Sequence, residues 1–232
     1  KTWTEYVNRL LGFLAGNVMI VGLIWFFTVY KQSKLKWLML LNLILMGIEG
    51  WFGSIVVATN LVPWTITIHL FLALVILLIQ IYILFKIRKI NYSEFRIEKS
   101  IRWLIWFILV ITFYQMFLGT QVREATDFLV KQHIPRSEFI ERLGLPFIIH
   151  RSFSWLVLIL LVFIAWKNEK SGKYNSIRLA FAVLGVELIT GVLLAYANMP
   201  GLVQTAHLVF ASILLGVLWQ IALALNNSKE WK

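Results

Sequence analysis

Three histidines stand near the starts of three apolar segments: His69, His150 and His207. Each lies within the first two turns of a segment long enough to span a membrane, so all three are predicted at one depth, close to the outer surface. Imidazoles bind transition metals, and two that face each other inside a four-helix bundle hold an iron porphyrin by both axial positions. His150 and His207 belong to one half of the chain and form the predicted pair. The alternative for each is an interfacial polar residue at a helix end.

Arginines stand beside these positions and at one further segment end. Arg151 follows His150 directly, Arg9 follows Asn8, and Arg123 closes another apolar segment. A guanidinium binds a carboxylate through two parallel hydrogen bonds, so we expect these arginines to bind the propionates of a porphyrin. The alternative is that their long side chains reach lipid phosphates.

Three carboxylates occupy unusual places. Glu49 and Glu187 fall near the middle of apolar segments, where an unpaired charge costs roughly 3 kcal/mol. They are candidates for proton delivery or for contact with a porphyrin edge, but the interhelical hydrogen bond is the favoured interpretation. Glu5 precedes Asn8 by about one helical turn. It could accept a proton or stabilise positive charge on a substrate carbon; alternatively, it is a helix N-terminal acid that favours the macrodipole.

The elements that must position these residues are transmembrane helices. The 232-residue chain is 60% hydrophobic, with a mean hydropathy of +0.80, far from a soluble globular composition. A spanning helix needs about 20 mostly apolar residues. Seven stretches meet this length, and they predict an all-α polytopic membrane protein: 6–30, 37–59, 65–87, 101–122, 146–166, 177–197 and 202–225.

The net charge of +11 follows membrane topology and does not indicate nucleic-acid binding. Lysine and arginine gather in the first, third and fifth connections, whereas the others are uncharged or mixed in sign. By the positive-inside rule the N-terminus of this chain is outside and the C-terminus is cytoplasmic, as in a multi-pass protein of a bacterial-type inner membrane. The chain has no cysteine, which excludes disulfides and thiolate metal sites.

An internal repeat divides the chain. An offset of 138 residues places Glu49 over Glu187, Asn60 over Asn198 and His69 over His207, and a slightly larger offset places Asn8 opposite His150. The prediction is a pseudo-symmetric pair of helix bundles, with three helices in residues 1–92 and four in residues 93–232. By symmetry a helix is expected before residue 1, and it would also explain how an outer N-terminus is inserted.

These short motifs resemble the haem A synthase family, and together they cover essentially the whole chain: EYVNR at 5–9, the His69 helix, GTQVR at 119–123, IHR at 149–151 and TAH at 205–207. The resemblance implies two four-helix bundles, with haem b held by His150 and His207 in the C-terminal one. It implies haem O as the substrate of the N-terminal bundle, where the C8 methyl group is oxidised to the formyl group of haem A. His69 would be a ligand of the substrate haem and Glu5 the catalytic carboxylate.

The chain departs from that family at Asn8, which replaces a histidine and is a poor iron ligand. The first site then keeps only His69 as a strong ligand, a change that suits oxidation or removes activity. The alternatives are a non-catalytic b-type cytochrome and a haem-binding assembly subunit. The absence of an inner histidine argues against the cytochrome. Beyond haem O and membrane lipid, haem O synthase is a candidate partner, while the electron donor and self-association stay open.

Overall fold

A computed structural model describes residues 2–88, 99–170 and 174–227 of the chain. Within these residues the elements are helical, in the order α1 (Thr2–Val29), α2 (Leu35–Ala58), α3 (Pro63–Ile87), α4 (Lys99–Lys131), the 3-10 helix η1 (Arg136–Glu138), α5 (Phe139–Arg142), α6 (Gly144–Lys170), α7 (Asn175–Tyr196) and α8 (Gly201–Asn227). Seven of the helices in this described part are long and apolar enough to cross a membrane. The prediction of an all-α polytopic membrane protein is confirmed.

The chain forms two compact units, Lys1–Lys89 and Ile90–Lys232, called unit 1 and unit 2 below. The predicted boundary between residues 92 and 93 lies outside the described residues.

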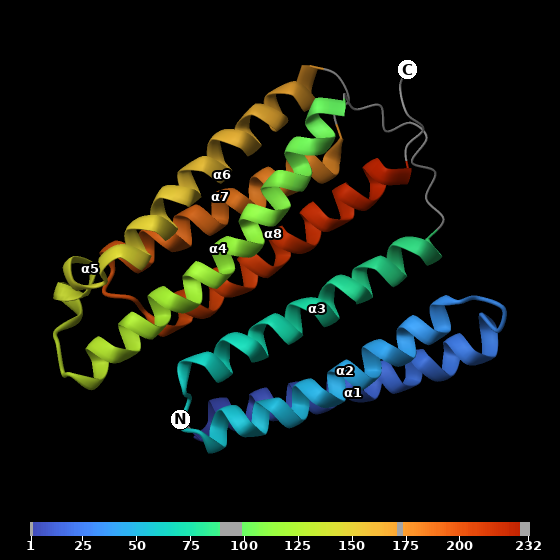
Figure 1. Cartoon of the computed structure of the whole chain (residues 1–232), viewed down its shortest axis with the longest axis horizontal. Helices are drawn as coiled ribbons and strands as arrows, with labels where there is room; N and C mark the ends of the chain where they lie inside the picture. The colour runs from blue at the N-terminus through green and yellow to red at the C-terminus, as the bar shows by residue number, and fades with distance from the viewer. Residues whose placement is uncertain (1, 89–98, 171–173, 228–232) are drawn as a thin grey trace. The chain divides into compact units, whose positions relative to one another are not determined.

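Unit 1 is a three-helix layer in which α2 contacts both α1 and α3 (Figure 1). Phe26, Met39 and Ile83 form a buried cluster that joins the three helices at one end. A polar link adds to it, because Nδ2 of Asn42 on α2 donates to the carbonyl of Ile76 at 3.3 Å and to Oε1 of Gln80 at 3.1 Å. Such interhelical hydrogen bonds fix the register of α2 on α3 where lipid offers no competing partner.

Unit 2 is a closed four-helix bundle. α4 contacts α6 and α8, and α7 contacts the same two helices on the other side (Figure 1). Buried aliphatic side chains from all four helices fill the core, among them Ile108, Leu161, Ile177 and Leu218. Because α6 and α8 are diagonal partners, side chains that point inward from them meet across the bundle interior.

Helix α4 is longer than predicted, which corrects the position of Arg123. The apolar segment was expected to end at residue 122, but α4 continues to Lys131. The extension is amphipathic: Thr126 and Leu129 are buried at helical spacing, while Arg123 lies 3.6 Å from Asp127 on the exposed side. Arg123 is therefore an internal residue of α4. A helix of this length, about 50 Å, extends well beyond a hydrocarbon core of about 30 Å.

The connection between α4 and α6 is folded against the bundle end. Leu129, Phe139, Leu143 and Met199 form a buried cluster there. Arg136 completes it, since its Nη1 donates to the carbonyl oxygens of Met199 at 3.0 Å and Asn198 at 3.3 Å. These bonds attach the α4–α6 connection to the turn between α7 and α8.

Replacing Arg136 with alanine should lower the free energy of unfolding by roughly 1 kcal/mol, because two backbone carbonyls lose a charged donor. The matched control is Arg142→Ala. In the described part of the chain Arg142 bonds only Glu138, one turn away on an exposed surface, and such a pair is worth about 0.3–0.5 kcal/mol. Thermal unfolding in detergent, followed by tryptophan fluorescence, gives both values. Equal midpoints for the two variants would show that the Arg136 contacts do not stabilise the fold.

The α2–α3 and α7–α8 connections share one backbone conformation, as the repeat predicts. Asn60 and Leu61 have φ of 54° and 62°, and Asn198 and Met199 have 58° and 51°. The left-handed region is costly for most residues, and asparagine tolerates it best after glycine. Both turns reverse the chain within a few residues, so each produces a tight antiparallel helix pair.

Candidate functional site

The two turns place each glutamate of the repeat at the level of a histidine. Glu49 and His69 lie on either side of the first turn, and Glu187 and His207 on either side of the second, with a separation of 20 positions in each pair. In antiparallel helices, residues equally far from the turn lie side by side. The distance from Oε1 of Glu49 to Nδ1 of His69 is 3.0 Å, and from Oε1 of Glu187 to Nδ1 of His207 it is 3.2 Å.

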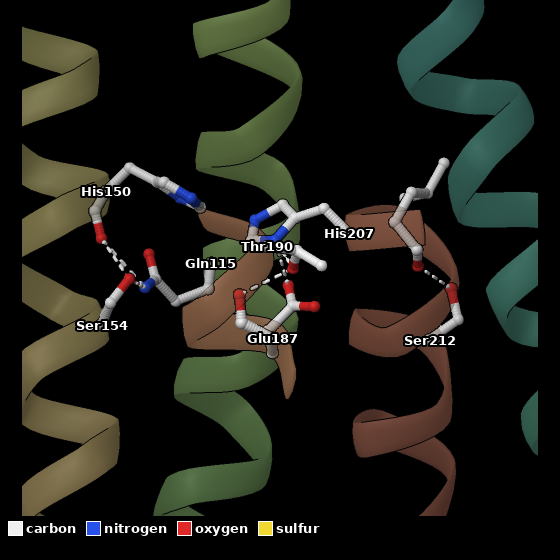
Figure 2. Close-up of polar contacts among 8 residues, drawn as sticks. Gln115, His150, Ser154, Glu187, Thr190, His207 and Ser212 are labelled. Carbon is white, nitrogen blue, oxygen red and sulfur yellow. Dashed lines mark hydrogen bonds and ion pairs between the residues drawn. The ribbon is translucent and has the colours of Figure 1, made fainter. Parts of the chain in front are cut away.

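In unit 2 a third side chain joins this contact. Thr190, one turn after Glu187 on α7, places Oγ1 2.9 Å from Nδ1 of His207 (Figure 2). The same hydroxyl donates to the main-chain carbonyl of Glu187 at 2.8 Å. Thr190 is buried, and the side chain of Glu187 is only 13% exposed. The imidazole of His207 is therefore held from one side by two oxygens of α7.

His150 enters the same bundle from α6 under different constraints. Its main-chain carbonyl accepts from Nε2 of Gln115 at 3.0 Å and from Oγ of Ser154 at 2.9 Å (Figure 2). Gln115 also donates to Ser154 at 2.9 Å, so α4 and α6 are joined directly below the imidazole. Nδ1 of His150 is buried and has no hydrogen-bond partner among the described residues.

His150 and His207 point toward one another across the bundle (Figure 2). Their ring centres are 6.3 Å apart and their planes meet at 75°. Two imidazoles on opposite sides of one metal ion have centres about 6 Å apart, from roughly 2 Å per metal–nitrogen bond and roughly 1 Å from nitrogen to ring centre. No group of three or more His, Asp or Glu side chains that could hold a metal ion occurs in the described ranges. Two imidazoles at this spacing instead suit a metal whose other ligands come from a macrocycle.

Glycines flank all three imidazoles. A Cβ atom at Gly119 would lie 3.7 Å from Cε1 of His150, and one at Gly191 would lie 3.4 Å from Cε1 of His207. In unit 1 the approach is closer, since a Cβ atom at Gly53 would lie 3.1 Å from Cε1 of His69. Small residues here let each ring lie against the neighbouring helix.

The remaining predicted residues of unit 1 lie on the exposed surface of α1. Glu5 and Arg9 form an ion pair of 2.7 Å, with side chains 45% and 62% exposed. Asn8 is exposed, and its side chain makes no hydrogen bond within the described part of the chain. The two strongest polar features of unit 1 are thus separate: a Glu49–His69 contact between α2 and α3, and a Glu5–Arg9 pair on α1.

In unit 2, Arg151 and Arg123 are also exposed. The guanidinium of Arg151 lies over the ring of Phe147, 5.6 Å from its centre, and Arg123 pairs loosely with Asp127. Cation–π and surface contacts of this kind are weak, so both side chains are available to a carboxylate ligand.

Sequence reasoning did not identify Thr190 or Gln115, and it did not assign Glu49 and Glu187 to the histidines. A signal was present for the glutamates, since the 20-residue separation recurs in both halves around matching asparagine turns. Thr190 and Gln115 carry no comparable signal, because threonine and glutamine also occur in spans as simple helix-packing residues.

Comparison with known proteins adds independent information. The model of the COX15-CtaA family, described as cytochrome oxidase assembly protein, matches residues 1–219. Among curated proteins, a haem A synthase of Wolbachia pipientis subsp. Culex pipiens is 27% identical, over 91% of this chain and 70% of its own length. A haem A synthase of Rickettsia bellii is 25% identical over 96% of this chain and 75% of its own. A haem A synthase of Pelagibacter ubique is 26% identical over 84% of this chain and 67% of its own length.

No solved structure matches the chain significantly. The family match nevertheless spans both units and every helix that carries a candidate residue. The chain therefore belongs to the COX15-CtaA family of cytochrome oxidase assembly proteins, the haem A synthase family.

Proposed function

We propose that this protein is a haem A synthase, an oxidoreductase of the membrane that converts the C8 methyl group of haem O into the formyl group of haem A. The curated relatives that it resembles along most of its length are named haem A synthases. The single observation that carries the proposal is the pair of imidazoles of His150 and His207, 6.3 Å apart inside one bundle.

In unit 2, His150 and His207 would be the iron ligands of haem b. The residues present fit such a group: the rings face each other, glycines flank both, and Nδ1 of His207 is already occupied by α7. Bound haem b supplies one-electron transfer. Arg151 and Arg123 are the candidates to bind its propionates, since both guanidinium groups are exposed and lightly engaged.

In unit 1, His69 would be the axial ligand of the substrate haem O. Oε1 of Glu49 lies 3.0 Å from Nδ1 of this imidazole, so the carboxyl group is placed to orient the ring. Glu5 is the proposed catalytic carboxylate, placed to accept a proton or to stabilise positive charge at the methyl carbon. Without substrate, Arg9 forms an ion pair with Glu5. When a propionate of the substrate binds Arg9, the carboxylate of Glu5 would become free to act. Asn8, whose amide is a poor iron ligand, would not add a second strong ligand to this site.

The proposed orientation follows the positive-inside rule: this N-terminus outside, the C-terminus in the cytoplasm, in a bacterial-type inner membrane. His69, His150 and His207 then lie in the outer part of the bilayer. A haem substrate would be delivered within the membrane plane, which makes haem O synthase a candidate partner.

Expression of the chain with a source of haem O, in cells that make no haem A, tests the proposal. The expected result is haem A in the extracted haem, identified by chromatography and mass spectrometry. Haem O alone, from a chain that is folded and carries haem b, would refute the oxidase.

A second function is favoured by one observation: Asn8, a poor iron ligand, stands where a histidine would complete the first site. A haem-binding assembly subunit would bind haem in unit 2 without oxidising haem O. The variant Asn8→His restores the ligand and separates the two functions. If the natural chain is an assembly subunit that makes no haem A but keeps its catalytic carboxylate, this variant should begin to make haem A.

A further inference from the structure

The tautomer of His207 follows from its neighbours on α7. Oγ1 of Thr190 donates its proton to the carbonyl of Glu187 at 2.8 Å, so toward Nδ1 of His207, at 2.9 Å, this oxygen acts as an acceptor. Oε1 of Glu187 lies 3.2 Å from the same nitrogen. Nδ1 is therefore the protonated nitrogen; it donates to the hydroxyl oxygen of Thr190, and the carboxyl oxygen of Glu187 lies close by.

With the proton on Nδ1, a neutral imidazole carries its lone pair on Nε2. Nε2 of His207 has no hydrogen-bond partner in the described residues, and its ring faces His150 (Figure 2). The contacts from α7 thus prepare the nitrogen that faces the bundle interior to bind a metal.

A carboxyl oxygen also lies beside the histidine of unit 1, although Nδ1 of His69 makes no hydrogen bond among the described residues and Phe52 stands in place of Thr190. Glu49 approaches Nδ1 of His69 at 3.0 Å, at positions that correspond to Glu187 and His207 by the 138-residue offset. Both glutamates are largely buried, 12% and 13% exposed. A buried carboxyl group is costly in a membrane, so its recurrence beside each histidine indicates a role at the histidine.

His150 provides the contrast. Its Nδ1 is buried without a partner among the described residues, and the nearest polar group of α4, Gln115, is neutral and bonded to the main chain. Of His150 and His207, only His207 lies beside a carboxyl group within the described residues.

We propose that Glu187 is a positioning residue for the ligand His207, acting together with Thr190, and that Glu49 does the same for His69. This inference rests on the proposed function, since it takes these histidines as haem ligands. An Nδ1–H bonded to a carboxyl oxygen makes Nε2 a more electron-rich ligand and fixes the ring orientation. Such a ligand stabilises ferric over ferrous iron, so Glu187 lowers the reduction potential of the haem in unit 2 and strengthens its binding.

The test uses the full chain with His69→Ala, expressed without a haem O source, so that the spectrum reports unit 2 alone. Glu187→Leu should weaken haemin binding about 10- to 100-fold. The reduction potential of the haem in this variant should rise, by about 59 mV for each tenfold by which ferric haem loses more affinity than ferrous haem. Glu187→Gln, which keeps an acceptor oxygen, should retain most of the affinity and show a smaller rise. Thr190→Val should raise the potential in the same direction.

The matched control is Glu169→Leu, which removes the same group at the far end of α6, where Glu169 pairs with Arg178 on the exposed surface. It should leave the potential and the EPR signal of the ferric haem unchanged. Wild-type reduction potentials in both Glu187→Gln and Thr190→Val would overturn the inference, even if Glu187→Leu fails to fold. So would an equal rise in Glu169→Leu. A wild-type chain that binds no haem would instead refute the proposed function itself.

Discussion

Replacing His207 with alanine is expected to abolish stable haem b binding in unit 2. Loss of an outer-shell partner typically costs 10- to 100-fold in metal affinity, so loss of the ligand itself should cost more than about 100-fold. The imidazole of His150 remains, but it has no partner for Nδ1 among the described residues and faces an empty ligand position. Haem per chain, measured as the pyridine haemochrome after purification, gives the result.

The control for this variant is Ser212→Ala on the same helix. Among the described residues Ser212 bonds the carbonyl of Leu208 in α8, at 2.9 Å, and its side chain is half-buried (Figure 2). Haem content should stay at the wild-type level. His150→Ala and the double variant should both match His207→Ala, because two ligands of one metal act as a unit and their effects do not add. Full haem content in His207→Ala would show that another residue binds the iron.

Replacing His69 with alanine should stop haem A formation while the haem b spectrum of unit 2 persists. His69 is the ligand proposed for the substrate, and it contacts Glu49 within unit 1, so its loss should not affect the helices that hold His150 and His207. We expect at least a 100-fold fall in haem A, by about the same reasoning as for His207. Thr67→Ala is the control on α3, since within the described residues Thr67 bonds only the carbonyl of Pro63 in its own helix. Unchanged haem A from His69→Ala would place the substrate elsewhere.

Glu5→Gln separates catalysis from binding at the same site. Removal of a proton-accepting carboxylate should lower the rate of haem A formation by about 10²- to 10⁴-fold. Haem O should still co-purify with the chain, because His69 and its Glu49 contact are intact. Loss of bound haem O together with activity would mean that Glu5 and its partner Arg9 bind the substrate and do not act on it.

The fold could be predicted from the sequence because apolar length alone defines a membrane span. All seven predicted stretches correspond to helices, yet α4 runs nine residues past its predicted end at 122, to Lys131. Hydropathy is low in that extension, so only the helical spacing of Thr126 and Leu129 indicates that the helix continues. The asparagine turns at Asn60 and Asn198 were visible as repeat positions, but their left-handed backbone was not.

The candidate site could be predicted only at the level of residue types. Histidines in apolar segments are conspicuous, and assigning His150 and His207 to one half was sufficient to place them in one bundle. Their partners depend on which side of each helix faces which neighbour, and that is set by packing. Glu187 meets His207 because the short turn aligns their helices, and Thr190 joins because it lies one turn further along α7.

The axial ligands of the haem in purified wild-type protein test the central claim most directly. EPR together with near-infrared magnetic circular dichroism of the ferric protein distinguishes two imidazole ligands from other ligand pairs. The account predicts one six-coordinate, low-spin, bis-histidine haem per chain in unit 2, absent from both His150→Ala and His207→Ala. A high-spin haem, or a bis-histidine signal that survives either substitution, would contradict it.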